Sequence, residues 1–417
     1  MRREPSLWRD PDFLKLWCGQ AISEIGTRVS REGIPWTALA VLHATPAQMG
    51  WLAALGGIAA LVGGPAAGSL ADRCKRKPLM IAADLGRAMI LVIVPIAAFG
   101  GWLTLAQLST VVFLVGLLNV LFLVAYPTYV PGLVGRDRLL AANSRLMLTG
   151  SVAEVSGPGI TGVLVQTLGA PRAILVDAVS FLISAVSIAW IRKPETQPER
   201  AASEGTWRDA VAGFQYVRRH PILRPLALRT GTAFFCFGTF MALYLLYASR
   251  DLQMNALTLG VIIALGGAGS LIGALLAERI GSRWRPGVIL FAATVWVGFW
   301  NLLNGLAPSP GVVAILCLGA AQLLGDIGYP IYNIHELTLR QRVTDPGMLG
   351  RVNASMQMIL QGAWPVGAII GGLLGEIVGA RVAMLVSASG AMLSSLWLLR
   401  SDIWKLQFDT IEEKVLL

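Results

Sequence analysis

The chain has 417 residues, of which 55% are hydrophobic and only 14% are charged. Soluble domains carry roughly 25% charged residues, and a mean hydropathy of +0.64 leaves too little polar surface to cover a water-soluble fold. This composition excludes a soluble enzyme, a disordered protein and a secreted disulfide scaffold. The formal net charge is +10, and in so apolar a chain the positions of the charges matter more than their sum.

Twelve apolar stretches reach the length of about 20 residues that a helix needs to cross a bilayer. Charge clusters and Gly/Pro turns separate these stretches, and we expect no cleavable signal peptide before the first. The sequence therefore predicts an all-α membrane protein with twelve transmembrane helices. The predicted spans are 14–42, 49–71, 79–100, 104–131, 141–168, 173–191, 222–248, 256–277, 286–305, 312–338, 352–375 and 382–399.

The loops differ in their positive charge. The loops joining spans 2–3, 4–5, 6–7, 8–9 and 10–11 carry most of the loop Lys and Arg, whereas the alternate loops carry only Arg172, Arg250 and Arg381. By the positive-inside rule, the first set of loops and both termini are expected in the cytoplasm. We therefore predict a multi-pass protein of the bacterial inner membrane, and the net charge is read as a topological signal and not as a nucleic-acid site.

The longest loop, residues 192–221, has two parts. Its start is polar and contains prolines, which is typical of a linker. In its second part, Trp207, Val211, Phe214 and Val217 recur at helical spacing, with arginines on the other faces. This pattern predicts an amphipathic helix lying on the inner membrane surface; a helix that docks a partner is the alternative.

The two halves of the chain repeat each other. GSLADRCKRKP at the end of span 2 corresponds to GALLAERIGSRWRP at the end of span 8, and Tyr-Pro occurs in both span 4 and span 10. Further matches at a constant offset of 210 are Asn143, Gly157, Gly162 and Gly169 with Asn353, Gly367, Gly372 and Gly379. We interpret this as duplication of a six-helix unit, and expect an N-terminal half at 1–191, a central loop at 192–221 and a C-terminal half at 222–417.

A motif after span 2 supports a family resemblance. It follows the pattern G-x-L-A-D-R-x-x-R-K and consists of Gly68, Leu70, Ala71, Asp72, Arg73, Arg76 and Lys77. With twelve spans and a long central loop, the chain resembles the major facilitator superfamily. Four further segments, GQAISEIG, VDAVSFLIS, YVRRHPILR and LGRVNA, are similar to the third group of drug–proton antiporters, which includes macrolide and enterobactin exporters.

The resemblance implies two pseudo-symmetric six-helix bundles and a secondary transporter. It would export a small amphipathic molecule, such as a drug, macrolide or siderophore-like compound, by alternating access with proton antiport. Gly68, Asp72, Arg73 and Arg76 would then form the latch that holds the halves together while the site opens outward. The alternative is that the arginines of this loop are only topological charges.

Span 5 contains Gly157, Pro158 and Gly162, which resemble the G-x-x-x-G-P-x-x-G-G motif of antiporters. Ala153 and Thr161 replace two of its glycines. Small residues permit close helix packing, and a proline removes one backbone hydrogen bond, so the helix can bend. In the family this motif is a gate that limits leakage; ordinary helix packing is the alternative.

Span 1 carries an unusual charged stripe. Glu24, Arg28, Arg31 and Glu32 lie at helical spacing on one face. Glu24 lies roughly 15 Å into the span at 1.5 Å per residue, where a charge costs about 2.5–3.5 kcal/mol. We expect these side chains to face a wet cavity, with Glu24 and Arg28 contacting substrate or proton; a self-neutralising structural ladder Glu24–Arg28–Glu32 is the alternative.

Other polar residues are predicted inside spans. Glu154 in span 5 and Asp326 in span 10 are candidates for substrate or proton coupling. Asn119 in span 4 is a further candidate, with interhelical hydrogen bonding as the alternative, whereas Asp177 in span 6 is more consistent with a structural role. Span 4 lacks the R-x-x-Q-G motif that many proton antiporters use. Either proton coupling is absent, or it has moved to Glu24 with Arg28.

Several signals are missing from the sequence. The four cysteines lie far apart without metal-ligand spacing, no phosphate-binding loop is present, and no nucleophile-and-base set is evident. We therefore expect no cofactor, no metal, no nucleic-acid partner and no enzymatic activity, and a monomer whose partners are the substrate, the proton and the bilayer. The competing functions are a uniporter or importer of a metabolite or lysolipid, and a non-transporting membrane sensor.

Overall fold

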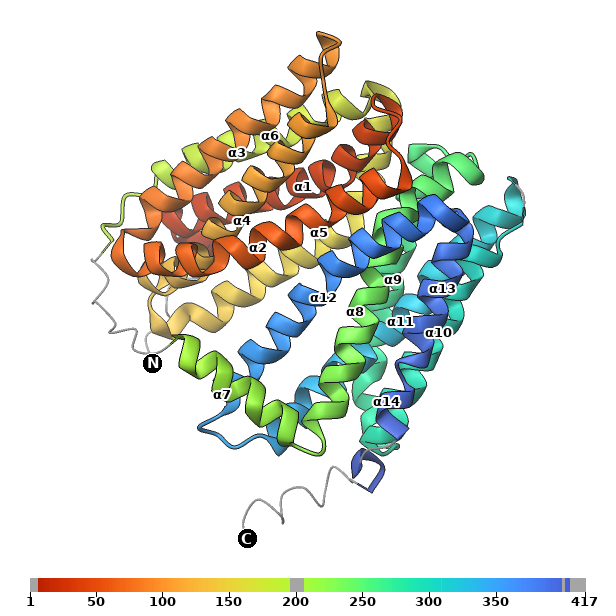
Figure 1. Cartoon of the computed structure of the whole chain (residues 1–417). Helices are drawn as coiled ribbons and strands as arrows, with labels where there is room; N and C mark the ends of the chain where they lie inside the picture. Colours follow the sequence, from red (N-terminus) through yellow and green to blue (C-terminus); the bar gives the residue numbers. More distant parts are fainter. Residues whose placement is uncertain (1–6, 196–205, 309, 400–401, 406–417) are drawn as a thin grey trace. The chain divides into compact units, whose positions relative to one another are not determined.

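The computed structural model describes residues 7–195, 206–308, 310–399 and 402–405, and each predicted span corresponds to a helix (Figure 1). The last span is divided between α13 and α14 by a turn at residues 394–395. The helices are α1 Pro11–Ala40, α2 Pro46–Arg73, α3 Arg76–Phe99, α4 Leu105–Val134, α5 Leu139–Leu168, α6 Ala170–Ala189, α7 Thr206–Arg219, α8 Leu223–Leu246, α9 Ala256–Gly281, α10 Pro286–Leu306, α11 Val312–Val343, α12 Leu349–Val378, α13 Ala380–Leu393 and α14 Leu396–Leu399.

Ten of the described helical segments are long and apolar enough to cross a membrane. The helices α1 and α5 have 30 residues each but do not meet this standard. They carry the charges that the sequence placed at membrane depth, Glu24 and Arg28 in α1 and Glu154 in α5. Because such charges are costly against lipid, we expect these side chains to face away from lipid and to belong to a functional site.

The duplication is visible in the backbone. The bounds of α5 and α12 differ by 210 residues at both ends. Gly169 and Gly379, which follow these helices, have φ angles of 83° and 85°. Among the residues that the structure describes, the non-glycine residues with positive φ are His43 and Gln253, at 50° and 52°, and they too are 210 residues apart. The repeat therefore preserves the bounds of this helix pair and the backbone conformations at these four positions.

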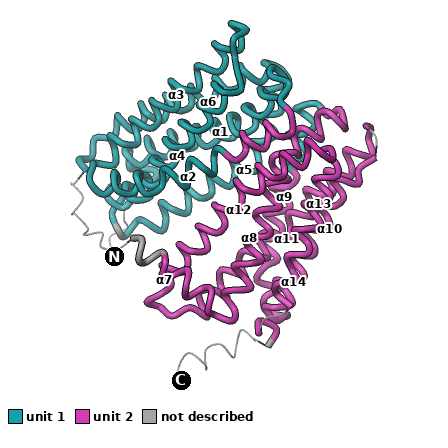
Figure 2. The backbone as a smooth tube through the Cα atoms, viewed as in Figure 1, with its two compact units in different colours: residues 1–44, 55–202, 255–264 teal, residues 45–54, 203–254, 265–417 magenta. Residues whose placement is uncertain are grey.

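The chain forms two compact units (Figure 2). Unit 1 consists of residues 1–44, 55–202 and 255–264, and unit 2 of residues 45–54, 203–254 and 265–417. The two short inserted segments are again 210 residues apart. Each begins a helix, α2 or α9, so one end of each of these helices belongs to the other unit. The simpler division predicted from the sequence, at residues 191 and 221, stays a prediction.

Glycines allow both short segments to pack closely. In unit 1, a Cβ added to Gly260 of α9 would lie 3.0 Å from the Cα of Gly162 in α5. In unit 2, a Cβ added to Gly50 of α2 would lie 2.8 Å from the Cα of Gly372 in α12. Membrane helices approach each other at this distance only where both residues are small. The matched positions of the four glycines show the same crossing built twice.

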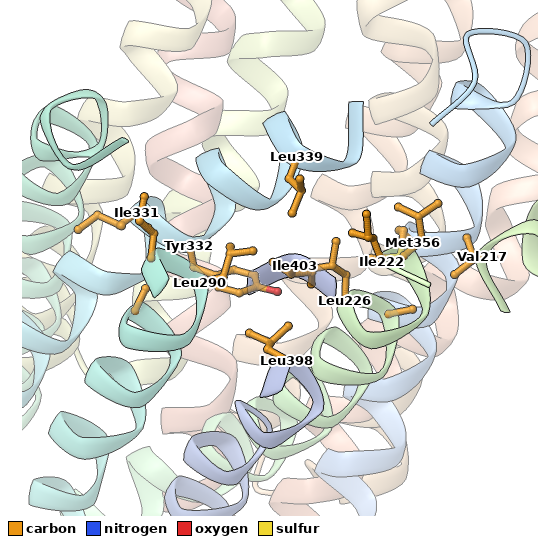
Figure 3. Packing of buried hydrophobic residues seen from close by; sticks show 14 of the residues in the cluster. Val217, Ile222, Leu226, Leu290, Ile331, Tyr332, Leu339, Met356, Leu398 and Ile403 are labelled. Carbon is orange, nitrogen blue, oxygen red and sulfur yellow. The ribbon is translucent and has the colours of Figure 1, made fainter. Parts of the chain in front are cut away.

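A large buried cluster in unit 2 anchors α7 to the membrane helices (Figure 3). Val217 of α7 is buried in this cluster, whereas Val211 and Phe214 are exposed. The predicted apolar stripe of α7 is therefore divided between the protein core and the surface; the side chain of Trp207 lies outside the described residues. The cluster also includes Ile222, Leu226, Leu290, Ile331, Tyr332, Leu339, Met356, Leu398 and Ile403.

Candidate functional site

The main charged cluster lies between α1 and α5 in unit 1. The guanidinium of Arg28 forms an ion pair with Glu154, and its Nη2 lies 3.9 Å from the carboxylate of Glu24. All three residues are near the middle of their helices. The side chain of Arg28 is 17% exposed, whereas Glu24 and Glu154 are 41% and 51% exposed. A mostly buried cation is thus held between two acids that remain accessible.

Arg31 and Glu32 extend this cluster. Arg31 lies 3.4 Å from Glu154 and 3.4 Å from Glu32. Of the alternative ladder Glu24–Arg28–Glu32, the structure contains only the Glu24–Arg28 contact. Arg28 pairs with Glu154 of α5, and Glu32 pairs with Arg31. The sequence proposed Glu24 with Arg28 and, separately, Glu154, and the structure brings the three together.

The small residues of α5 make room for this cluster. A Cβ added to Gly157 would lie 2.7 Å from both Cβ and Cγ of Arg28. Pro158 follows directly in the interior of α5, and Gly162 packs against Gly260 one turn further on. The antiporter-like segment thus has two contacts in unit 1: its first glycine seats Arg28, and its last allows a close helix crossing.

A second, fully buried charged pair was missed in the sequence analysis. Arg87 and Asp84 of α3 form an ion pair in which both side chains are almost completely buried. The guanidinium of Arg87 lies 4.0 Å from the ring centroid of Phe181, and its Nη1 donates to the Oδ1 of Asn119 at 3.1 Å. Asn119 therefore contacts Arg87 and joins α4 to α3. The spacing of an acid and an arginine at i and i+3 inside an apolar span was the signal for this pair.

Asp177 of α6 is buried beside α1. Its carboxylate accepts a hydrogen bond from Ser180 at 3.0 Å. A Cβ added to Gly26 of α1 would lie 2.7 Å from Oδ1 of Asp177, so glycine is required for this close approach. The location favours the structural role expected for Asp177.

Asp326 in unit 2 has a different environment. It is half-buried near the middle of α11, and a Cβ on Gly266 of α9 would collide with its carboxylate. Within the described residues of unit 2, Asp326 forms no ion pair. The charged groups of unit 2 that do have partners lie elsewhere: Glu336 is 3.6 Å from Arg340, and Arg229 donates to Thr294 at 3.1 Å. These buried groups were also missed in the sequence analysis.

The predicted latch residues lie at the end of α2, which contains Gly68, Asp72 and Arg73, and at the start of α3, which begins with Arg76. Asp72 and Arg73 are exposed, and a Cβ on Gly68 would meet open space. Arg76 lies 3.8 Å from Glu195, whose carboxylate also accepts hydrogen bonds from the backbone N–H groups of Arg76 and Lys77, at 2.6 and 2.9 Å. Glu195 therefore caps the start of α3, where the helix dipole favours an anion. Within unit 1, Arg76 acts in this cap.

A neighbouring cap ties the end of α6 to α1. Asp12 accepts hydrogen bonds from the backbone N–H groups of Arg192 and Lys193, at 3.2 and 3.0 Å. Partial burial alone would raise the pKa of Asp12, but the hydrogen bond from Lys15 and those from the backbone outweigh it and lower the pKa. Among the described residues, no group of His, Cys, Asp and Glu has the arrangement of a metal site.

Comparison with known proteins identifies the family. A sequence profile of the Major Facilitator Superfamily matches residues 16–367. The chain belongs to this superfamily. The crystal structure of the nucleoside transporter NupG superimposes with a TM-score of 0.76 over 95% of this chain and 99% of its own, at 13% identity. The superfamily match and this structural similarity confirm the predicted all-α fold of twelve membrane helices in two six-helix bundles.

Two relatives in sequence are transporters whose names give their cargo. Macrolide efflux protein A of Streptococcus pyogenes is 24% identical over 90% of this chain and 92% of its own length. Enterobactin exporter EntS of Escherichia coli O1:K1 / APEC is 26% identical over 93% of this chain and 89% of its own length. The resemblance to macrolide and enterobactin exporters is confirmed, and the chain is an integral membrane transporter of the superfamily.

Proposed function

We propose that this superfamily member exports a small amphipathic organic molecule by alternating access, in exchange for protons. The names of its relatives, a macrolide efflux protein and an enterobactin exporter, support the direction and the class of cargo. The protein would lie in the bacterial inner membrane with both termini in the cytoplasm, as the distribution of Lys and Arg among the loops indicates.

The observation that carries the proposal is the accessible acid pair around Arg28. A cationic or hydrogen-bond-donating group of the cargo would bind the accessible, ionised carboxylates of Glu154 and Glu24, and protonation of either acid would remove that acceptor. Binding of cargo and binding of proton would then exclude each other at the same carboxylates. That exclusion is the chemical requirement for exchange.

Asp326 would supply a second proton site in unit 2. A carboxylate at membrane depth without a counter-ion is costly, and protonation removes the charge that the membrane penalises. Asn119 would act through Arg87, since it is bound to that guanidinium. The segment containing Gly68, Asp72, Arg73 and Arg76 would act as the conformational latch. Asp72 would supply its negative charge, since Glu195 is already used in the cap of α3.

The test uses a bacterial host that lacks its own multidrug exporters. The host expresses the wild-type chain, Glu24→Gln, or the control Asp251→Asn, which changes an exposed acid between α8 and α9 outside the cluster. Accumulation of amphipathic cations, macrolides and catechol siderophores is followed with and without a protonophore. We expect wild type and control to lower the level of at least one compound, a protonophore to restore it, and Glu24→Gln to be inactive while still inserted.

Other outcomes identify the competing functions. Accumulation that rises with the proton gradient would indicate import, and equilibration that ignores the protonophore would indicate a uniporter. Ligand binding without counterflow of labelled compound would indicate a sensor. Wild-type efflux by Glu24→Gln would remove this acid from coupling, and Glu154→Gln and Asp326→Asn would then be compared in the same assay.

A further inference from the structure

A groove of about 500 Å³ lies between α7 and α12 in unit 2. It is outside the charged cluster described above and has no part in the proposed exchange. One wall is apolar and comes from both helices, and two arginines stand at the C-terminal end of α7. The residues used below are Val211, Phe214, Met358, Ile359, Arg218 and Arg219.

The apolar wall is exposed although the helices beside it are tightly packed. Val211, Phe214 and Met358 are 42%, 53% and 50% exposed. A Cβ added to Gly213 of α7 would lie 2.5 Å from the backbone oxygen of Arg351 in α12, so the two helices touch through their backbones there. With Val217 buried in the core as well, the orientation of α7 is fixed and its outer apolar residues cannot turn inward.

The two arginines of the groove stand apart from the acids of the part of the chain that the structure describes. Arg218 and Arg219 are exposed, and neither forms an ion pair or side-chain hydrogen bond with any residue that the structure describes. No carboxylate lines the groove. Both arginines line the groove, and a guanidinium group can bind a phosphate through two hydrogen bonds.

The position of the groove indicates what kind of phosphate-bearing molecule would fit it. Only three residues separate the end of α7 from α8, so the arginines lie where a membrane helix begins. Met358 lies about nine residues into α12, or roughly 14 Å along the helix at 1.5 Å per residue. The groove therefore runs from a cationic end near the membrane surface to an apolar end at acyl-chain depth.

We infer that this groove binds one anionic phospholipid, with its phosphate on Arg218 and Arg219 and an acyl chain along Val211, Phe214, Met358 and Ile359. The lipid would join α7 to α12 at the membrane surface. Its headgroup charge matches the two arginines, and its chain covers the apolar wall. A soluble phosphate compound would leave that wall exposed.

The experiment adds phosphatidylglycerol or phosphatidylcholine to the purified full chain in detergent and counts bound lipids by native mass spectrometry. We expect one phosphatidylglycerol to bind at least about tenfold more tightly than phosphatidylcholine. The variant R218Q/R219Q should lose this preference. The matched control R283Q/R285Q removes two exposed arginines from the α9–α10 loop of the same unit and should keep it. Phe214→Ser should weaken the binding of both lipids.

Each remaining outcome would overturn the inference. Equal binding by wild type and R218Q/R219Q, or equal loss in both double variants, would mean that the groove is not the site. Displacement of the lipid by inorganic phosphate would indicate a free anion, and displacement by an exported compound would indicate a cargo site. Because all four arginines are exposed, both double variants should keep the wild-type unfolding temperature, which the same preparations can report. This test does not require transport, so it can fail independently of the proposed function.

Discussion

The helix pair α1–α5 of unit 1 and the pair α8–α12 of unit 2 occupy equivalent places in the repeat but make contact differently. The offset of 210 residues places Gly238 where the first repeat has Arg28, and Trp364 where it has Glu154. In unit 1 these positions form an ion pair. In unit 2, a Cβ on Gly238 would overlap the backbone oxygen and indole ring of Trp364, so a glycine packs directly against a tryptophan.

The difference shows which properties of the duplicated unit were kept and which changed. The bounds of α5 and α12, the backbone conformation at the glycines that follow them, and the glycines at 157 and 367 are preserved. The side chains between the helices are not: one pair is polar and accessible, and the other is apolar and closely packed. The repeat therefore fixes a backbone arrangement, while the chemistry of the candidate site is confined to one copy.

The largest effect on transport is expected from removing Arg28, the cation of the polar pair. Arg28→Leu removes the partner that Glu24 and Glu154 share, and Arg31 stays beside Glu154. Because both acids are accessible, the free energy of unfolding should fall by only about 1 kcal/mol, whereas transport should be abolished. Chemical unfolding in detergent and the efflux assay measure the two quantities. Adding Glu154→Gln should recover part of the stability but none of the transport, and an unchanged stability of Arg28→Leu would show that the pair contributes nothing to folding.

A smaller effect on transport is expected from substituting the two matched glycines, 157 and 367, by alanine. A Cβ at Gly367 would overlap the backbone of Phe235, whereas a Cβ at Gly157 would meet the side chain of Arg28. Gly367→Ala should therefore cost about 2 kcal/mol, because helices must separate. Gly157→Ala should cost about 1 kcal/mol but displace Arg28, so its main effect should be slower efflux.

Gly362→Ala is the control for both substitutions, since a Cβ at this position of α12 meets open space. Alanine favours a helix over glycine by up to about 1 kcal/mol, so the control should be neutral or stabilising. Unfolding in detergent measures all three variants. If Gly157→Ala were as destabilising as Gly367→Ala and left efflux unchanged, the polar and apolar pairs would be mechanically equivalent.

The smallest effect is a change of stability with pH, and it concerns the side chains that cap the starts of α1 and α8. Asp10 accepts hydrogen bonds from the backbone N–H groups of Asp12 and Phe13, both at 3.2 Å. His220, the equivalent residue of the repeat, accepts through Nδ1 from Ile222 and Leu223, at 3.2 and 3.3 Å. Only a neutral imidazole nitrogen can accept, so the hydrogen bonds of His220 are sensitive to acid.

Burial lowers the pKa of His220 below its ordinary value of 6.5, although nearby Asp345 opposes the shift. The unfolded chain then binds the proton more tightly than the folded chain, so the free energy of unfolding should fall as the pH drops below 6.5 and be constant above it. His220→Ala should cost about 1 kcal/mol at pH 8. His220→Asp should keep the cap and reduce the loss between pH 8 and 5.5; an identical pH dependence in wild type and both variants would contradict this assignment.

Much of the fold follows from local sequence. Spans end where charges and Gly/Pro turns interrupt apolar runs, and the turn glycines 169 and 379 reveal the repeat because few other residues adopt their backbone conformation. The candidate acids at 24, 154 and 326 were also evident, since a charge in an apolar run is rare whatever its partner. These properties depend on neighbours in sequence, which a single chain displays.

Partner choice was decided only by the tertiary structure. The sequence suggested a missing arginine in span 4, but Arg87 reaches Asn119 of α4 from α3. It placed Val217 with Phe214 on one apolar face, but packing buries the first and exposes the second. It could not distinguish Glu154, which has two arginines, from Asp326, which has no ion partner in the described part of unit 2. Sequence determines where a charge enters the membrane, whereas the approach of helices distant in sequence determines which charge or backbone it meets there.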